Sequence, residues 1–248
     1  MLRFSGTNVL LTGAASGIGR ATAARLLREG AALFALDRDA EGLDELVWSA
    51  TGGPGRVLTA TVDITDHPAV ESAVAVAAET LGGIDVLVNV AGAHRTTPIE
   101  QLAVEDLREL FEVNCVGTAV VCREALRHLP DGSGVIVNVA SSSAAHGNPY
   151  MTAYSASKGA VLSFSLSLAA ELVGRGIRVV PVSPGQVTTP LVAGGLPDGL
   201  DPSYFGRIRS LMGPADPEQI AGVIAFAASR DASYLTGAEV RVDGGSHI

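Results

Sequence analysis

Short apolar runs alternate with longer stretches of helical periodicity along most of the chain. The apolar runs predict seven buried strands, at Asn8–Thr12, Ala31–Asp37, Val57–Asp63, Asp85–Asn89, Gly134–Ala140, Arg178–Val182 and Val240–Val242. The periodic stretches, bounded by Gly and Pro, predict helices at Ala21–Glu29, Glu41–Ser49, Pro68–Leu81, Val104–Leu129, Ala153–Val173 and Pro217–Ser229. Strands that are apolar throughout and alternate with helices are typical of parallel sheets. We therefore expect a three-layer α/β fold, a doubly wound parallel seven-stranded sheet with helices on both faces.

The longest segment without a predicted helix or strand is Ser183–Ala215, which is rich in Pro and Gly. A loop of this length in a compact domain is usually a lid or a binding loop. We expect a lid over about residues 186–214, near the carboxyl ends of the strands, where such sheets bind ligands. No linker divides the rest of the chain, so we expect residues 1–248 to form one domain.

The composition raises the question of a membrane. Hydrophobic residues make up 47% of the chain and charged residues 17%, and the mean hydropathy is +0.33. Two long stretches carry no charge. Gly132–Ser157 contains many polar residues and Val179–Pro197 contains several prolines, so neither is expected to form a helix that spans a bilayer. The apolar run Val9–Leu11 is too short for the core of a signal peptide. We expect a cytoplasmic protein without a membrane partner.

Charge and cysteine content narrow the range of partners and sites. The 17 basic and 26 acidic residues give a net charge of −9 without a basic cluster, which argues against nucleic acid as a partner. Cys115 and Cys122 stand seven apart on a predicted helix, about 10 Å along its axis, too far for a disulfide. We expect two free buried thiols, as in a reducing compartment. We expect no metal site, because no further Cys or His stands at ligand spacing beside them.

A glycine-rich loop follows the first predicted strand. Its sequence is Thr12-Gly13-Ala14-Ala15-Ser16-Gly17-Ile18-Gly19, with the spacing Gly-x-x-x-Gly-x-Gly. Glycines in such a loop let the backbone turn tightly and approach a pyrophosphate at a helix amino terminus. The spacing differs from the commoner Gly-x-Gly-x-x-Gly, and a strand-to-helix turn with no ligand is the alternative interpretation.

An acidic residue ends the second predicted strand. Asp37 stands 18 residues after Gly19, close to where dinucleotide-binding folds place the carboxylate that accepts hydrogen bonds from the adenosine ribose. Because a carboxylate would repel a 2′-phosphate, Asp37 favours NAD over NADP. Arg38 could instead turn its guanidinium toward such a phosphate, although we favour a solvated surface charge. Asp63, at the end of the third strand, is a candidate to contact the adenine.

A tyrosine and a lysine stand four apart at the start of a predicted helix. This spacing places the phenol of Tyr154 and the ammonium of Lys158 on one helix face. A nearby positive charge favours the ionised phenol and would lower its pKa from about 10 toward the working pH. Tyr154 is therefore a candidate general acid and base, although such a pair also occurs by chance on many helices.

Together these features resemble the short-chain dehydrogenase/reductase family in its single-domain form. The resemblance runs from Asn8 to Gly245 and rests on motifs in a fixed order: Thr12–Gly19, Asp63, Asn89-Val90-Ala91-Gly92, Asn114, Ser141, Tyr154 with Lys158, Pro184-Gly185 with Thr189, and Val242-Asp243-Gly244-Gly245. One departure is Val90, where the family more often has a second Asn. The resemblance implies a Rossmann-type fold and an oxidoreductase that binds NAD, or less readily NADP.

Four catalytic residues are implied by the resemblance: Asn114, Ser141, Tyr154 and Lys158. Tyr154 would exchange a proton with the substrate oxygen, and the Ser141 hydroxyl would orient that oxygen. Lys158 would hold the nicotinamide ribose and depress the pKa of the tyrosine. Asn114 would hold a water in the proton path to solvent, which is compatible with a cap or a kink in the long helix.

The resemblance also implies the residues that hold the cofactor. Val187 and Thr189 would fix the nicotinamide carboxamide. Ser16 stands where NADP-preferring relatives often carry a basic residue, so its neutrality supports NAD. The full set comprises Gly13, Ser16, Gly17, Ile18, Gly19, Asp37, Arg38, Asp63, Ile64, Asn89, Ala91, Gly92, Tyr154, Lys158, Pro184, Gly185, Val187 and Thr189.

The substrate side is less well defined by the sequence. By analogy with the family, we expect the pocket to be lined by His94, Ser143, His146, Tyr150, Gln186 and Leu191. Apolar residues in the lid favour a hydrophobic substrate. His94 or His146 could hydrogen-bond a polar substituent, or lie at the surface. The segment Val139–Lys158 also resembles the branch of the family that oxidises dihydrodiols of benzoate to catechols.

We therefore expect an NAD-dependent enzyme that interconverts a secondary alcohol and a ketone on a hydrophobic or cyclic small molecule, with dihydrodiols and hydroxysteroid-like alcohols among the candidates. Two alternatives stay open: an NADPH-dependent carbonyl or 3-oxoacyl-thioester reductase, and a cofactor-binding regulator without catalytic activity. Members of the family form tetramers through two long helices, so we expect a homotetramer. The stripe that would contribute to this contact, or to the core, comprises Ala160, Val161, Phe164, Leu168 and Leu172.

Overall fold

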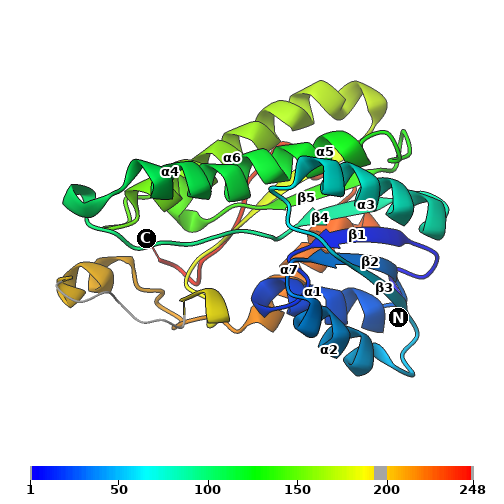
Figure 1. Ribbon diagram of the computed structural model, residues 1–248, viewed down its shortest axis with the longest axis horizontal. Coiled ribbons are helices and arrows are strands. Elements are labelled where there is room, and N and C mark those ends of the chain that lie inside the picture. The colour runs from blue at the N-terminus through cyan, green and yellow to red at the C-terminus, as the bar shows by residue number, and fades with distance from the viewer. Residues whose placement is uncertain (1, 193–199, 247–248) are drawn as a thin grey trace.

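Seven parallel strands form one twisted sheet at the centre of the protein (Figure 1). In the computed structural model, which describes residues 2–192 and 200–246, the strands are β1 (Asn8–Thr12), β2 (Ala32–Asp37), β3 (Arg56–Thr61), β4 (Val86–Asn89), β5 (Val135–Val139), β6 (Arg178–Pro184) and β7 (Val240–Val242). Their order across the sheet is β3-β2-β1-β4-β5-β6-β7, and each neighbouring pair is parallel. The predicted doubly wound α/β sheet is confirmed.

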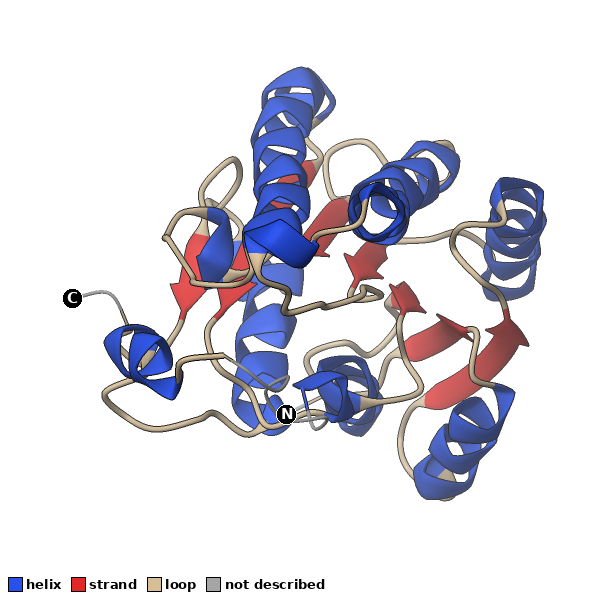
Figure 2. Ribbon diagram, turned by 60° about the vertical axis from the view of Figure 1, so that its left-hand side comes forward, coloured by secondary structure: helices blue, strands red, loops and turns tan. Residues whose placement is uncertain are grey.

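Helices cover both faces of this sheet (Figures 1 and 2). One face carries α1 (Gly17–Arg28), α2 (Ala40–Ala50) and α7 (Pro217–Ala228), and the other carries α3 (His67–Leu81), α4 (Val104–Phe111), α5 (Thr118–Ala125) and α6 (Thr152–Leu172). Shorter helical turns lie at η1 (Ile99–Gln101), η2 (Glu112–Gly117), η3 (Ser142–Ala144), η4 (Val173–Arg175), η5 (Pro190–Val192), η6 (Pro202–Ile208) and η7 (Arg230–Ala232).

Successive residues of the central strands face two separate cores. In β1, Val9 and Leu11 pack in the core that includes α1 and α7, whereas Leu10 packs in the core that includes α3 and α5. All three side chains are completely buried. A strand buried on both faces needs an apolar residue at every position, which is why the sequence has uninterrupted apolar runs here.

Several element boundaries differ from the prediction beside the carboxyl edge of the sheet. Strand β3 ends at Thr61 and not at Asp63, so Asp63 lies in the segment after the strand, and β5 ends at Val139 and not at Ala140. Helix α1 begins at Gly17 and not at Ala21, because the glycine loop itself supplies the first helical turn. Strand β6 continues to Pro184 and not only to Val182. Gly17 and Pro184, both expected to contact the cofactor, therefore belong to helix α1 and strand β6 and not to loops.

The helix predicted over residues 104–129 contains a π-helical turn. It runs as α4, the π turn η2 and then α5, which ends at Ala125. The turn places Asn114 in the interior and packs Gly117 against Ile64, where a Cβ would lie 2.9 Å from Cδ1 of that side chain. Cys115 and Cys122 are free thiols, and Cys115 is only half-buried, contrary to the expectation of two buried thiols. The turn was not predicted because the residues that it buries, Asn114 and Gly117, are polar or small and leave no apolar signal.

The expected lid contains two short helical turns, η5 and η6, and is followed by helix α7. Its residues 193–199 lie outside the described residues. Near its end the backbone of Ala215 exchanges hydrogen bonds with Gln186 and Thr188, each 2.9 Å long. The two ends of the lid segment are therefore joined to each other.

Among the described residues, one helix is long and apolar enough to cross a membrane by length and composition, the run Thr152–Arg175 formed by α6 and η4. Its inner face is buried on the sheet through residues that include Ser157, Val161, Ser165 and Ala169. A helix of the core that is apolar on most sides passes the same test.

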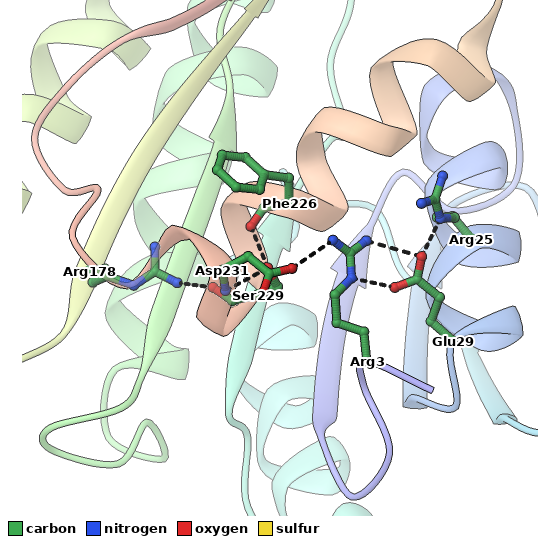
Figure 3. Close-up of polar contacts among 7 residues, drawn as sticks. All are labelled: Arg3, Arg25, Glu29, Arg178, Phe226, Ser229 and Asp231. Carbon is green, nitrogen blue, oxygen red and sulfur yellow. Dashed lines mark hydrogen bonds and ion pairs between the residues drawn. The ribbon is translucent and has the colours of Figure 1, made fainter. Parts of the chain in front are cut away.

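A polar cluster ties together segments at the amino-terminal end of the strands (Figure 3). Arg3 donates to both carboxylate oxygens of Glu29, at 2.6 and 3.0 Å, and also contacts Asp231 at 3.3 Å. Arg25 donates to the same Glu29 carboxylate from one helical turn earlier. Arg178 donates to the backbone oxygens of Ala227, Ser229 and Leu235 at 2.9–3.1 Å, which satisfies carbonyls in the last turn of α7 and after it.

We predict that Glu29→Gln lowers the free energy of unfolding by about 1–2 kcal/mol at neutral pH, because it removes a carboxylate that accepts charge-assisted hydrogen bonds. Burial acts to raise the pKa of the Glu29 carboxyl, but its bonds with Arg3 and Arg25 outweigh this and lower the pKa below 4.5. The difference between wild type and variant should therefore be complete above pH 4.5 and fade as the pH falls further.

Urea unfolding at several pH values measures this difference. Glu79→Gln is the matched control, because Glu79 is exposed and forms no ion pair in the described part of the chain. Equal effects of the two substitutions, or an effect of Glu29→Gln that persists in acid, would contradict the prediction.

Candidate active site

A cavity of about 410 Å³ opens at the carboxyl ends of the central strands. Loops after β1, β2, β3, β4, β5 and β6 contribute to its walls, together with the start of α6. The site residues predicted from the sequence that line it are Gly13, Ser16, Gly17, Ile18, Gly19, Asp37, Arg38, Asp63, Ile64, Ala91, Gly92, His94, Ser141, Tyr154, Lys158, Pro184, Gly185, Val187, Thr189 and Leu191.

The glycine loop forms the floor of the cavity between β1 and α1. Gly13 has a φ of +71°, and a Cβ on it would lie 2.6 Å from the backbone nitrogen of Ala91. A Cβ on Gly19 would lie 1.8 Å from the carbonyl oxygen of Gly13. Gly13 is therefore required by its positive φ and by the nearby Ala91 backbone, and Gly19 is required because a side chain would collide with the Gly13 carbonyl. The result is an open backbone surface at the amino terminus of α1, which fits a pyrophosphate.

Asp37 joins the end of β2 to the glycine loop. One carboxylate oxygen accepts a hydrogen bond from the Ala15 N–H at 2.9 Å, and the other accepts from the Asp39 N–H at 3.0 Å. Arg38 is exposed on the same rim. Bonds from the Thr65 N–H and hydroxyl lower the pKa of Asp63, and the charge of Arg38 adds to this effect.

Two predicted residues, Asn89 and Asn114, lie behind the cavity wall and do not line it. The Asn89 amide donates to Oδ1 of Asn138 at 2.9 Å and is almost completely buried. The departure at Val90 is accommodated by the backbone, because the N–H groups of Val90 and Ala91 donate to the Thr12 hydroxyl at 3.2 and 3.3 Å. Asn89 therefore supports the cavity floor from below.

Asn114 joins the π turn to the segment after β4 and to α6. Its Oδ1 accepts from the Ala93 N–H at 2.8 Å, and its Nδ2 donates to the Ala93 carbonyl at 3.0 Å and to Oγ of Ser157 at 2.9 Å. These bonds hold the Asn114 side chain in place without any group in the cavity. The wall that carries Ala93 and His94 is thereby fixed to the helix that carries Tyr154.

Tyr154 and Lys158 lie one helical turn apart at the start of α6, and both face the cavity. Burial raises the pKa of the Tyr154 phenol above its ordinary value, although a hydrogen bond with Ser141 acts in the opposite direction, so the lowering expected from Lys158 is not found. The ring of His94 packs edge-on to the Tyr154 ring, with centroids 4.6 Å apart. Burial lowers the pKa of Lys158 to about 8. Its Nζ donates to the Val139 carbonyl at 2.9 Å, which aims the ammonium at the end of β5.

The turn after β6 closes the other side of the cavity. The Gly185 N–H donates to the Val242 carbonyl at 2.9 Å, and a Cβ on Gly185 would lie 2.7 Å from Cα of Asp243. The Thr189 side chain reaches across to the glycine loop, where a Cβ on Gly17 would lie 3.2 Å from it. The carboxyl-terminal Val-Asp-Gly-Gly motif thus packs directly behind the Pro184-Gly185 turn.

Only two of the six residues predicted for the substrate pocket line the cavity. His94 and Leu191 line the cavity beside Tyr154. Four others do not line it. Ser143 is buried and bonds to Ser141, His146 contacts Arg241, Tyr150 packs against the rings of Tyr204 and Phe205, and Gln186 is exposed.

Comparison with known proteins explains this constellation. A profile of the family described as enoyl-(acyl carrier protein) reductase matches residues 13–247. The chain belongs to the short-chain dehydrogenase/reductase family. Members of this family bind NAD(P). The relatives are named as dehydrogenases and reductases, and the chain is an oxidoreductase. The resemblance inferred from the motifs is confirmed.

Relatives of nearly equal length match over almost the whole chain. The chain is 41% identical to cis-4-hydroxycyclohexanecarboxylate dehydrogenase of Sinomonas cyclohexanicum, with coverage of 95% of this chain and 94% of that protein. It is 39% identical to 3-oxoacyl-[acyl-carrier-protein] reductase FabG of Thermotoga maritima, with coverage of 98% and 99%. A crystal structure of a short-chain dehydrogenase from Burkholderia cenocepacia J2315 in complex with NADP is 31% identical, with a TM-score of 0.90 and coverage of 99% and 100%.

The short-chain dehydrogenase cavity also includes residues that the sequence did not single out. They are Leu36, Asp39, Val62, Ala93, Glu109, Val113, Val139, Ala140 and Pro190. Most adjoin a predicted residue in the sequence. Glu109 and Val113 stand four apart on the helix that leads to Asn114, so the same helical spacing that paired Tyr154 with Lys158 would have identified this wall.

We predict that Gly13→Ala lowers the free energy of unfolding by about 2 kcal/mol and abolishes NAD(P) binding, because alanine is strained at this φ and its Cβ would displace the Ala91 backbone. Chemical denaturation and calorimetric titration with the cofactor measure the two effects. Gly174→Ala is the control, since no atom lies within 4 Å of its Cβ position and its φ is not positive. Wild-type cofactor affinity in Gly13→Ala would contradict the role of the loop.

Proposed function

We propose that the protein is an NAD-dependent dehydrogenase that interconverts a secondary alcohol and a ketone on a hydrophobic or cyclic substrate. The observation that carries this proposal is the meeting of Ser141, Tyr154 and Lys158 in the same cavity that the glycine loop lines. A phenol and a hydroxyl that face the same space suit an oxygen that gains or loses a proton.

In the oxidative direction, the substrate hydroxyl would lie between the Ser141 hydroxyl and the Tyr154 side chain, which acts as the base once its phenol is ionised. Tyr154 accepts the hydroxyl proton, while Ser141 donates a hydrogen bond to the same oxygen as negative charge develops on it. The Lys158 ammonium would hold ribose hydroxyls of the cofactor. When bound, the nicotinamide supplies the acceptor of the hydride from the carbinol carbon.

The preference for NAD rests on Asp37 and Ser16. The Asp37 carboxylate is held by the Ala15 and Asp39 N–H groups, so it cannot swing away from a ribose phosphate without breaking both bonds. A 2′-phosphate next to it would experience like-charge repulsion. Ser16, at the start of α1, offers no compensating positive charge.

The proposed substrate follows from the walls around Tyr154. Val113, Val187, Pro190 and Leu191 provide apolar surface. Among the described residues, His94 makes no hydrogen bond, and burial lowers its pKa. Its neutral ring can therefore bond a polar substituent of an otherwise hydrophobic alcohol. Cyclic alcohols agree with the 41% identical relative, which is named for a hydroxycyclohexanecarboxylate; dihydrodiols and hydroxysteroid-like alcohols are further candidates.

A second candidate is an NADPH-dependent carbonyl or 3-oxoacyl-thioester reductase. It is favoured by exposed Arg38 on the cavity rim, which could pair with a 2′-phosphate. The 39% identical relative is named as a 3-oxoacyl reductase, and the related Burkholderia structure contains NADP. The third interpretation, a regulator without catalysis, is the weakest because Asn114, Ser141, Tyr154 and Lys158 are all present.

We also propose that the enzyme is a cytoplasmic homotetramer. In the stripe expected to contribute, Val161 and Leu172 are buried within the protomer, so core packing accounts for these two. Ala160, Phe164 and Leu168 are partly buried. The apolar side chains left open along this helix and its end are Leu166 and Val173, with 38% and 63% exposure, and they support an association through α6.

We predict that wild-type enzyme reduces NAD with at least one member of a panel of cyclic and aliphatic secondary alcohols, dihydrodiols and hydroxysteroids. Tyr154→Phe should lower kcat about a thousand-fold while it leaves cofactor affinity nearly unchanged, because only the proton-transfer group is lost. NADH absorbance measures turnover. Tyr234→Phe is the control, since Tyr234 is fully exposed, and unchanged turnover in Tyr154→Phe would refute the catalytic assignment.

We predict that NAD binds about tenfold more tightly than NADP, a difference of about 1.4 kcal/mol. Asp37→Asn should remove most of this preference, because its amide oxygen can still accept from Ala15 but carries no charge. Thermal shifts with each cofactor measure the preference. Asp44→Asn, at an exposed carboxylate outside the cavity, is the control. A larger shift with NADP in wild type would favour the reductase candidate.

A further inference from the structure

Three consecutive serines follow β5, and only two of them are joined to each other. Oγ of Ser143 donates to Oγ of Ser141 at 2.9 Å, and the Ser143 N–H donates to the same oxygen at 3.2 Å. Ser143 is 3% exposed and does not line the cavity, whereas Ser141 does. Ser143 therefore touches the catalytic serine from the protein side and has no surface for the substrate.

The two bonds determine what the Ser141 hydroxyl can do. A hydroxyl oxygen has two acceptor positions and one proton. Ser143 occupies both acceptor positions, one through its backbone and one through its side chain. The Ser141 hydroxyl can then use its single proton only as a donor toward the cavity, to Tyr154 or to a substrate oxygen.

We propose that Ser143 is a positioning residue that holds the Ser141 hydroxyl as a hydrogen-bond donor toward the reacting oxygen and Tyr154. This inference rests on the proposed dehydrogenase function and deepens it. No bond is made or broken at Ser143. Its hydroxyl polarises the Ser141 O–H, and a chain of donors that point the same way is stronger than its members separately.

The effect is greatest when negative charge develops on the substrate oxygen. A donor already oriented toward this oxygen needs no reorganisation at that moment. Without the Ser143 hydroxyl, the Ser141 hydroxyl could rotate and accept a bond from Tyr154 or from the substrate. Such a rotation would remove stabilisation mainly from the transition state, and so it would lower kcat more than it raises KM.

Ser143→Ala tests the proposal with an alcohol that the wild-type enzyme oxidises. We expect kcat to fall about five- to ten-fold, the effect of one hydrogen bond of roughly 1–1.4 kcal/mol, with KM changed by less than about two-fold. Ser143→Thr, which keeps the hydroxyl, should restore kcat. Ser142→Ala is the matched control, because Ser142 is equally buried, with 5% exposure, and its side chain makes no hydrogen bond among the described residues. Wild-type kcat in Ser143→Ala, or equal losses in both alanine variants, would overturn the proposal.

A second measurement needs no substrate. The protein has four tyrosines, so tyrosine labelled with ¹³C at Cζ gives few NMR signals, and Tyr154→Phe assigns the one of interest. We expect Ser143→Ala to shift the Tyr154 signal, since the donor from Ser141 is altered, and Ser142→Ala to leave it in place. The other polar groups that face Tyr154, His94 and Lys158, are the same in both variants.

The two measurements separate this inference from the proposed function. If no alcohol of the panel is oxidised by the wild-type enzyme, the proposed function fails, while the NMR signal still decides whether Ser143 acts on Tyr154 through Ser141. An unchanged Tyr154 signal in Ser143→Ala overturns the proposal in either case.

Discussion

A chain of buried amide and hydroxyl groups runs across the carboxyl edge of the sheet, and the geometry of the site depends on it. The Asn89 amide lies between Thr12 on β1 and Asn138 on β5, and Asn138 in turn donates to Ser165 on α6 at 2.9 Å. Each group would be costly to bury alone. Together they hold the glycine loop, the segment after β4 and helix α6 at fixed distances from one another.

This chain explains how one helix serves both packing and chemistry. Helix α6 is held to β5 by the Asn138–Ser165 bond in its middle and by the Lys158 bond to Val139 near its start. The Asn114–Ser157 bond joins its second turn to the π turn. Tyr154 therefore projects into the cavity from a helix that is fixed by three polar bonds as well as by apolar contacts.

The sequence was sufficient to predict the fold and most of the residues that line the cavity. The inner residues of β1, Val9 to Leu11, are all apolar because both faces of the strand are buried, and the glycine and Tyr-Lys spacings map onto one strand-to-helix turn and one helix face. It was not sufficient for the substrate side. Whether Ser143 or His94 faces the cavity depends on how an irregular loop folds back, and no periodicity encodes that path. The π turn at Asn114 was missed because the residues that it buries, Asn114 and Gly117, are polar or small and do not contribute to an apolar pattern.

The ion pairs of Arg3 and Arg25 with Glu29, together with the Arg178 bonds, lie at the amino-terminal end of the strands, while the cavity opens at the opposite end. The amino-terminal end of the sheet therefore contributes stabilising polar contacts, and the carboxyl end contributes the cavity. Loops at the carboxyl edge can accumulate substitutions that alter substrate choice while the anchoring of the termini and of α1 to α7 stays unaffected. A scaffold with this division tolerates functional diversification, and relatives that are named for butanediol, threitol and glucose share nearly its whole length.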